Sequence, residues 1–193
     1  MKWGGAKYLD NYIIPRQNLR KKLEIPLDST VLLSVGELNS NKNHKLIIET
    51  LPLLDSKVFY VVCGKGALKD EYLMLAKKLG VFDRLKLVGY VHNTSDFYKM
   101  EDVFVFPSRR EGLPVSVMEA IASELPIIVS NVRGSRDLAA NYEYGEIVYS
   151  FDINKWVNAL NFVINHSNNI VFKRNSIVFD INEIMLMFIK FIN

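Results

Sequence analysis

The chain has 193 residues, of which 49% are hydrophobic and 23% are charged, and its formal net charge at pH 7 is +3. These proportions exclude a disordered, collagen-like or disulfide-framework protein and predict one packed domain. The basic residues are scattered rather than gathered in a stripe, which argues against a nucleic-acid partner. The single cysteine, Cys63, excludes an internal disulfide and is typical of a reducing compartment.

The sequence contains no pattern typical of a membrane span or a signal peptide. Uninterrupted apolar runs such as residues 58–63 are far shorter than the roughly 20 residues of a membrane span. Residues 1–5 are followed by no apolar stretch, as a signal peptide would require. The sequence therefore predicts a cytoplasmic protein.

Short apolar runs alternate with helical patterns along the chain. Several runs are apolar at successive positions, which is typical of strands that are covered on both faces in a parallel sheet. The predicted strands cover residues 31–35, 58–63, 85–88, 103–106, 127–129 and 146–148.

The intervening stretches place apolar residues three or four positions apart, as one face of a helix requires. Gly80 stands where a helix-ending glycine belongs, and Pro114 suits the first turn of a helix. The predicted helices cover residues 16–23, 45–54, 67–79, 95–100, 115–123, 152–164 and 182–192. Strands and helices that alternate in this way, with right-handed crossovers, predict an α/β fold: a Rossmann-like, doubly wound parallel sheet with helices on both faces.

Ligands of such sheets bind beyond the carboxyl ends of the strands. The predicted loops at that edge are rich in glycine and proline, and most of them carry basic residues. They cover residues 36–43, 64–67, 89–94, 107–114 and 130–137.

The first of these loops combines a glycine turn at Gly36, a flexible cation at Lys42 and the N–H groups of a helix start. This combination suits a phosphate or another anion, although the Gly-Lys-Ser/Thr of a Walker loop is absent. The same residues fit a plain polar loop with an asparagine cap equally well. His44 is predicted to cap or to pack rather than to catalyse.

Gly64 and Gly66 follow the second predicted strand and resemble the beginning of a dinucleotide fingerprint. The third glycine is missing, because Lys69 stands in its place, and no acid follows the next strand at the fitting position. A tight turn explains the pair unless other loops converge on it, in which case both glycines would line a ligand site.

The segment 107–120 carries two acids, Glu111 in the loop before a predicted helix and Glu119 eight residues later within it. Eight helical residues at about 1.5 Å each span roughly 12 Å, similar to the separation between a nucleotide's ribose and the sugar beyond its diphosphate. One carboxylate could bind ribose and the other the sugar, with the amides of Gly112 and Leu113 facing the anion between them. Two solvated glutamates on a surface helix would show the same spacing.

The residues around these acids resemble the family 4 retaining glycosyltransferases of GT-B architecture. The matching stretches are Val-Leu-Leu-Ser-Val-Gly-Glu-Leu-Asn-Ser-Asn-Lys-Asn-His at 31–44, residues 104–122, and Pro-Ile-Ile-Val-Ser-Asn-Val-Arg-Gly-Ser-Arg-Asp-Leu at 126–138. Glu111 and Glu119 match the two acids of the family's E-x7-E motif. The form of the first stretch is most similar to enzymes that assemble bacterial exopolysaccharide, capsule or lipopolysaccharide.

The resemblance implies a glycosyltransferase that moves a sugar from a nucleotide-diphosphate donor, usually a UDP-sugar, to an acceptor hydroxyl without a metal or other cofactor. The catalytic residues it implies are Lys42, which neutralises the leaving diphosphate, and Glu111, which binds the sugar. Glu119 would bind the ribose, and Tyr90 and Val91 would lie beside the base.

Two departures from the family's pattern change these expectations. The family commonly has arginine after Gly36, but this chain has Glu37, so that either Lys42 would act with less help or Arg109 or Arg110 would assist it. In addition, GT-B enzymes have two domains, and this chain matches only the C-terminal, donor-binding one.

We therefore expect residues 1–30 to enter from a missing N-terminal domain and residues 31–193 to form the nucleotide-sugar-binding domain. The chain would be a piece of a longer enzyme or one part of a split enzyme, inactive or feeble alone. The full enzyme would bind a glycan or lipid-linked acceptor through the missing domain, in the cytoplasm or peripherally at the inner membrane face.

Residues 181–192 carry more apolar surface than one core-facing stripe needs. Together with residues 3–14 they are predicted to form an exposed surface meant for the missing domain, through which the chain could associate with itself. The apolar residues of the later segment are Ile184, Met185, Leu186, Phe188, Ile189 and Phe191.

Three other functions fit parts of the pattern. A non-catalytic nucleotide-sugar-binding partner or regulatory subunit would carry the same loops without turnover. A nucleotide-sugar epimerase of GT-B architecture shares the fold, but its known motifs are absent here. A signalling receiver would need an acidic cluster at the strand ends, where this chain has basic and glycine-rich loops.

Overall fold

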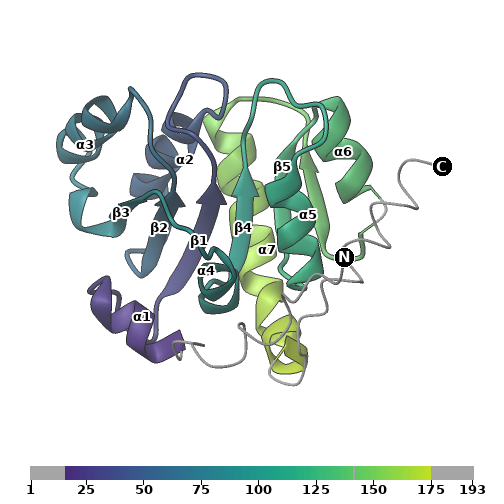
Figure 1. The fold of residues 1–193 in the computed structure, drawn as a ribbon, viewed down its shortest axis with the longest axis horizontal. Coiled ribbons are helices and arrows are strands. Elements are labelled where there is room, and N and C mark those ends of the chain that lie inside the picture. Colours follow the sequence, from purple (N-terminus) through teal and green to yellow (C-terminus); the bar gives the residue numbers. More distant parts are fainter. Residues whose placement is uncertain (1–15, 141, 175–193) are drawn as a thin grey trace, which may run out of the picture.

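The computed structural model describes residues 16–140 and 142–174, which form an α/β domain (Figure 1). Its six strands are β1 (Thr30–Val35), β2 (Val58–Cys63), β3 (Leu85–Gly89), β4 (Val103–Phe106), β5 (Ile127–Ser130) and β6 (Gly145–Val148). All six predicted strands are confirmed, each to within one residue at either end. The predicted segments 3–14 and 181–192 lie outside the described residues.

The strands form one parallel sheet in the order β3-β2-β1-β4-β5-β6. The predicted doubly wound, Rossmann-like fold is therefore confirmed. The strand order reverses between β1 and β4, which are neighbours although two strands separate them in the sequence. At such a switch point the chain leaves adjacent strands toward opposite faces of the sheet.

Helices cover both faces of the sheet (Figure 1). Their bounds are α1 (Arg16–Lys22), α2 (His44–Thr50), α3 (Lys69–Lys78), α4 (Ser95–Met100), α5 (Val115–Ala122), α6 (Arg133–Ala139) and α7 (Ile153–Arg174), with short 3-10 turns η1 (Leu51–Leu53) and η2 (Phe82–Arg84). Gly80 ends α3 with a φ of 69°, as predicted.

Two predicted helix ends were wrong, and one helix was not predicted. The helix predicted over 45–54 ends at Thr50 and tightens into η1, because Pro52 lacks the N–H group that would continue it. Residues 130–137 were predicted as a loop, but α6 begins inside them at Arg133, since packing overrides the low helix propensity of Gly134 and Ser135. The helix predicted over 152–164 continues to Arg174.

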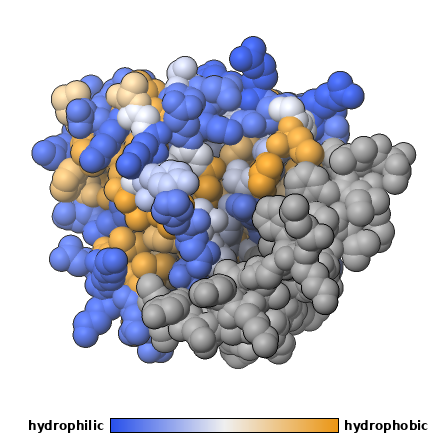
Figure 2. Space-filling view, viewed as in Figure 1, coloured by the Kyte–Doolittle hydropathy of each residue, from blue (hydrophilic) through white to orange (hydrophobic). Residues whose placement is uncertain are grey.

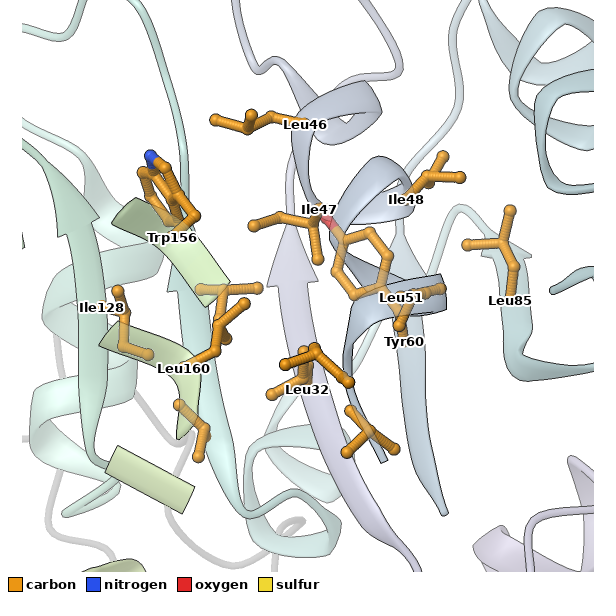
Figure 3. Close-up of a cluster of buried hydrophobic side chains, with 14 of the residues drawn as sticks. Leu32, Leu46, Ile47, Ile48, Leu51, Tyr60, Leu85, Ile128, Trp156 and Leu160 are labelled. Atoms are coloured by element: carbon orange, nitrogen blue, oxygen red, sulfur yellow. The ribbon is translucent and has the colours of Figure 1, made fainter. Parts of the chain in front are cut away.

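One of two hydrophobic cores lies between the sheet and α2, α3 and α7. Figure 3 shows Trp156 and Leu160 of α7 pointing toward Ile47 of α2 and Leu32 of β1. Trp156, Ile47, Leu32 and Leu160 are all fully buried. Burial of such large side chains provides the main driving force for holding helices on a sheet.

The second core lies on the other face and includes Leu19 and Ile25, so that α1 and the turn after it pack on the sheet. The buried Arg20 donates to the carboxylate of Asp102, the residue before β4 (2.8 Å). The same carboxylate accepts from the N–H of Val31 (2.7 Å) and from Arg16. Residues 16–30 thus belong to the packed domain, whereas a preceding domain stays a prediction.

The face of the domain shown in Figure 2 is mainly hydrophilic, with apolar residues in smaller patches. Among the helices of the described residues, none combines the length and apolar character that crossing a bilayer demands.

Candidate functional site

The switch point brings together the loop after β1 and the loop after β4, which carry Lys42 and Glu111. Both strands run in the same direction and pair directly, so their carboxyl ends lie side by side at the upper edge of the sheet in Figure 1. Beyond β1 the chain enters α2 on one face, and beyond β4 it enters α5 on the other. Open α/β sheets bind ligands at this place.

Hydrogen bonds that involve two asparagines join these loops. The N–H of Arg109 donates to the carbonyl of Asn41 (2.8 Å), and the Asn41 amide donates to the carbonyl of Arg110 (3.0 Å). Asn43 is buried, and its backbone lies in the left-handed region (φ 55°). Its side-chain amide donates to the carbonyl of Pro107 (3.2 Å). From the sequence, these asparagines were predicted only to be polar loop residues or a cap; their spacing on either side of Lys42 was the available signal.

Lys42 and Glu111, predicted to be catalytic, form an ion pair across the two loops with 2.7 Å between Nζ and Oε1. The Lys42 ammonium also lies 4.9 Å from the centre of the Phe106 ring. Its methylene groups pass Gly36, where an added Cβ would lie 3.4 Å from three of their carbons. The lysine is thus held by contacts from three directions.

Glu119 lies in α5, and its Oε2 accepts a hydrogen bond from the Tyr98 hydroxyl (2.8 Å). Tyr98, in α4, was not singled out in the sequence. Glu111 precedes the helix, which begins only at Val115. The helical rise therefore does not apply between positions 111 and 114, and the sequence-based separation of roughly 12 Å is not a helical distance.

Gly112 and Leu113, whose amides were predicted to face an anion, lie in the loop before α5, and Pro114 is the residue that caps this helix. A Cβ at Gly112 would meet no atom within 4 Å, so this backbone is open to a ligand. Gly134 of α6 packs beneath it: a Cβ there would lie 1.9 Å from the Gly112 carbonyl oxygen. This role of Gly134 was not predicted from the sequence.

Gly64 and Gly66 pack the loop after β2 against the loop after β1. A Cβ at Gly64 would lie 1.8 Å from the carbonyl oxygen of Gly36, and one at Gly66 would lie 2.3 Å from that of Leu38. Only glycine allows this close approach of two backbones. The two loops therefore converge, which was the condition for a ligand site at these glycines. Direct contact between the glycines and a nucleotide sugar stays a prediction.

Tyr90 and Val91, predicted to lie beside the base, follow β3 at the same edge of the sheet. Tyr90 is exposed, with the His92 ring 5.2 Å away and the Lys65 ammonium 5.9 Å from its ring centre. Val91 packs inward against the second core. An aromatic surface beside a cation suits a planar ligand.

Glu37 and Arg109 occupy the margins of the site. The exposed Glu37 carboxylate accepts from the Asn39 amide (2.9 Å). The Arg109 guanidinium donates to Asn43 Oδ1 (3.4 Å) and lies 5.0 Å from the centre of the Phe151 ring. Arg109 is therefore anchored beside the loop that carries Lys42.

His44, predicted to cap or to pack, is buried at the start of α2. Its Nδ1 lies 2.8 Å from the Tyr60 hydroxyl, and its Nε2 lies 3.2 Å from the carbonyl oxygen of Glu37. The Tyr60 hydroxyl donates to Ser34, whose hydroxyl donates to the carbonyl of Val105. This chain of contacts ties the loop to β1, β2 and β4 and confirms packing.

Burial lowers the pKa of His44 from 6.5 to about 4. Because the unfolded state then binds a proton more readily, stability should be intact above pH 6.5 and lost as the pH falls toward 4, by about 3 kcal/mol. Urea unfolding at several pH values checks this, and His44→Gln should show a shallower decline over that interval. Equal declines in both proteins would contradict the assignment.

Within residues 16–140 and 142–174, His, Cys, Asp and Glu side chains form no group of three or more that could hold a metal ion. The ionic centre of the site in these residues is the Lys42–Glu111 pair.

The family model described as "Glycosyl transferases group 1" matches residues 15–175. The chain therefore belongs to this family, and the resemblance drawn from the sequence is confirmed.

Two relatives show the extent of the match. EpsD of Bacillus subtilis strain 168 is 36% identical over 138 residues, which cover 70% of this chain and 36% of EpsD. The UDP-Gal:alpha-D-GlcNAc-diphosphoundecaprenol alpha-1,3-galactosyltransferase of Escherichia coli is 34% identical over 156 residues, or 76% of this chain and 40% of the enzyme. The chain thus spans about two fifths of the length of these relatives.

Solved structures share the fold. Anabaena Alr3699/HepE, solved in complex with UDP and glucose, has a TM-score of 0.75 at 17% identity, over 92% of this chain and 51% of that one. WaaG, a glycosyltransferase involved in lipopolysaccharide biosynthesis, has a TM-score of 0.72 at 22% identity, over 85% and 48%.

Proposed function

We propose that the chain is the donor-binding part of a retaining glycosyltransferase that takes a sugar from a nucleotide diphosphate, in particular UDP. The observation that carries the proposal is the Lys42–Glu111 pair at the switch point of the sheet. A cation for the diphosphate and a carboxylate for sugar hydroxyls are the two groups that such a donor needs side by side. The relative that is named for UDP-Gal and the HepE complexes with UDP-glucose support this class of donor.

In this proposal each predicted residue has one task. Lys42 neutralises the diphosphate as the sugar leaves, when negative charge develops on the leaving oxygen. The open backbone at Gly112 and Leu113 lies along the diphosphate, and Glu119, oriented by Tyr98, accepts hydrogen bonds from the ribose. Tyr90 and Val91 contact the base. A glycan or lipid-linked acceptor would be held by a separate N-terminal domain.

Titration calorimetry of the chain with UDP, GDP, UDP-glucose and UDP-galactose tests donor binding. Binding of UDP and at least one UDP-sugar is expected, and failure of all four ligands to bind would defeat the proposal. Turnover on addition of a chain that supplies the acceptor domain would distinguish an enzyme from a non-catalytic binding subunit.

Donor binding is expected without a divalent metal. The proposed neutralisation of the diphosphate rests on Lys42, with Arg109 beside it, rather than on a metal held by carboxylates. UDP titrations in EDTA, and again with added Mg²⁺ or Mn²⁺, should give affinities within about two-fold of one another. Binding that EDTA abolishes and either metal restores would contradict this expectation.

A further inference from the structure

Glu111 is paired with Lys42, the cation that would bind the diphosphate of the proposed donor. Its Oε1 lies 2.7 Å from Lys42 Nζ, and the two side chains are only 11% and 22% exposed. A partly buried pair is screened less by water and salt than a surface pair. A diphosphate that binds Lys42 therefore competes with a carboxylate that already holds it.

Lys42 has little freedom to satisfy both anions. Its stem lies against Gly36 and its ammonium lies over the Phe106 ring, so these contacts favour a position of the charge beside Glu111. Two neighbouring side chains do not take over the role of Lys42 as the cation for a diphosphate. Glu37 is an acid that is bonded to Asn39, and the Arg109 guanidinium contacts Asn43 and Phe151.

The competition depends on what else Glu111 can bind. Sugar hydroxyls are hydrogen-bond donors, and a carboxylate that accepts from them has fewer lone pairs for an ammonium. A nucleotide diphosphate without its sugar offers no such donors at that position. The same carboxylate then stays on Lys42 and repels the phosphates.

We propose that Glu111 sets the preference of the site for the nucleotide sugar over the free nucleotide diphosphate by competing for Lys42. The sugar draws the carboxylate away and releases the ammonium to the diphosphate, whereas loss of the sugar returns the carboxylate and favours product release. This inference rests on the proposed function and adds a selectivity role to Glu111.

Glu111→Gln tests the inference, because glutamine keeps the shape and a hydrogen-bond acceptor but not the charge. We expect the variant chain to bind UDP about five-fold more tightly, in line with loss of a competing ion pair of modest strength. It should bind UDP-glucose or UDP-galactose, whichever the unchanged chain prefers, no more tightly than before. The ratio of the two affinities should therefore fall.

Two controls separate competition from a general change of charge. Glu37 is an acid at the same edge of the sheet, but its carboxylate bonds to Asn39 and not to a cation. Glu37→Gln should therefore leave the ratio of UDP-sugar affinity to UDP affinity unchanged. In a Lys42→Met background, Glu111→Gln should tighten UDP binding less than it does when Lys42 is present, because only the repulsion between the carboxylate and the phosphates is then removed.

Either of two results would overturn the inference while leaving donor binding intact. One is a Glu111→Gln chain that binds UDP no more tightly than the unchanged chain, with the same thermal unfolding midpoint. The other is a gain in UDP affinity that is just as large in the Lys42→Met background. An unchanged chain that binds neither UDP nor a UDP-sugar would defeat the proposed function and this inference together.

Discussion

Gly134→Ala is expected to lower the free energy of unfolding by about 3 kcal/mol and to weaken UDP binding at least ten-fold. The new Cβ would lie 1.9 Å from the carbonyl oxygen and 2.8 Å from the carbonyl carbon of Gly112, and 3.0 Å from Cδ of Pro114. All three atoms belong to the backbone or to a rigid ring, so the loop itself must move. Urea unfolding and titration calorimetry measure the two effects.

Gly112→Ala is the matched control on the opposite side of the same contact. A Cβ there meets nothing within 4 Å, so stability should be unchanged. If the diphosphate lies along this backbone, UDP affinity should still fall. A Gly134→Ala chain with unchanged unfolding and unchanged UDP affinity would show that α6 does not hold the loop in place.

Glu119→Ala is expected to weaken UDP and UDP-sugar binding alike, because the ribose is common to both ligands. A lost hydrogen bond to a charged group costs about 1.5–3 kcal/mol, or roughly ten- to a hundred-fold in affinity. Glu111→Ala should instead weaken the UDP-sugar only, because it removes the acceptor of the sugar hydroxyls but also the carboxylate that competes with UDP for Lys42. Calorimetry with both ligands on both variants makes the comparison.

Tyr98→Phe provides the control for Glu119, since it removes only the hydroxyl that donates to Oε2. A loss smaller than that of Glu119→Ala, and equal for both ligands, would indicate that Tyr98 orients the carboxylate. Equal losses of both ligands in the Glu111→Ala and Glu119→Ala chains would contradict the separate tasks of the two acids.

The sheet was predictable from the sequence because buried parallel strands are uniformly apolar. The runs at β2 and β4 are buried at every position, as is typical of strands that are covered on both faces. Helix α6 was not predictable in this way. Its glycine and serine have low helix propensity, and only tertiary packing shows that small residues are needed beneath the loop.

The site was predictable in its residues but not in its contacts. Motif resemblance identified Lys42 and Glu111, yet their pairing depends on two loops that are 69 residues apart in the sequence. The pairing follows from the reversed strand order, which no local pattern encodes. The glycines at 64 and 66 resembled the beginning of a dinucleotide fingerprint, whereas their close backbone contacts are with another loop.

The bonds from Asn41 and Asn43 to the loop after β4 reach carbonyl groups rather than side chains. Every amino acid supplies a carbonyl, so the side chains at positions 109 and 110 can be exchanged without removing these anchors. The backbone of the site is thus held by the asparagines, whereas its selectivity depends on other side chains of the two loops. Attempts to redirect the donor preference should therefore vary the loop after β4 and leave the asparagines unchanged.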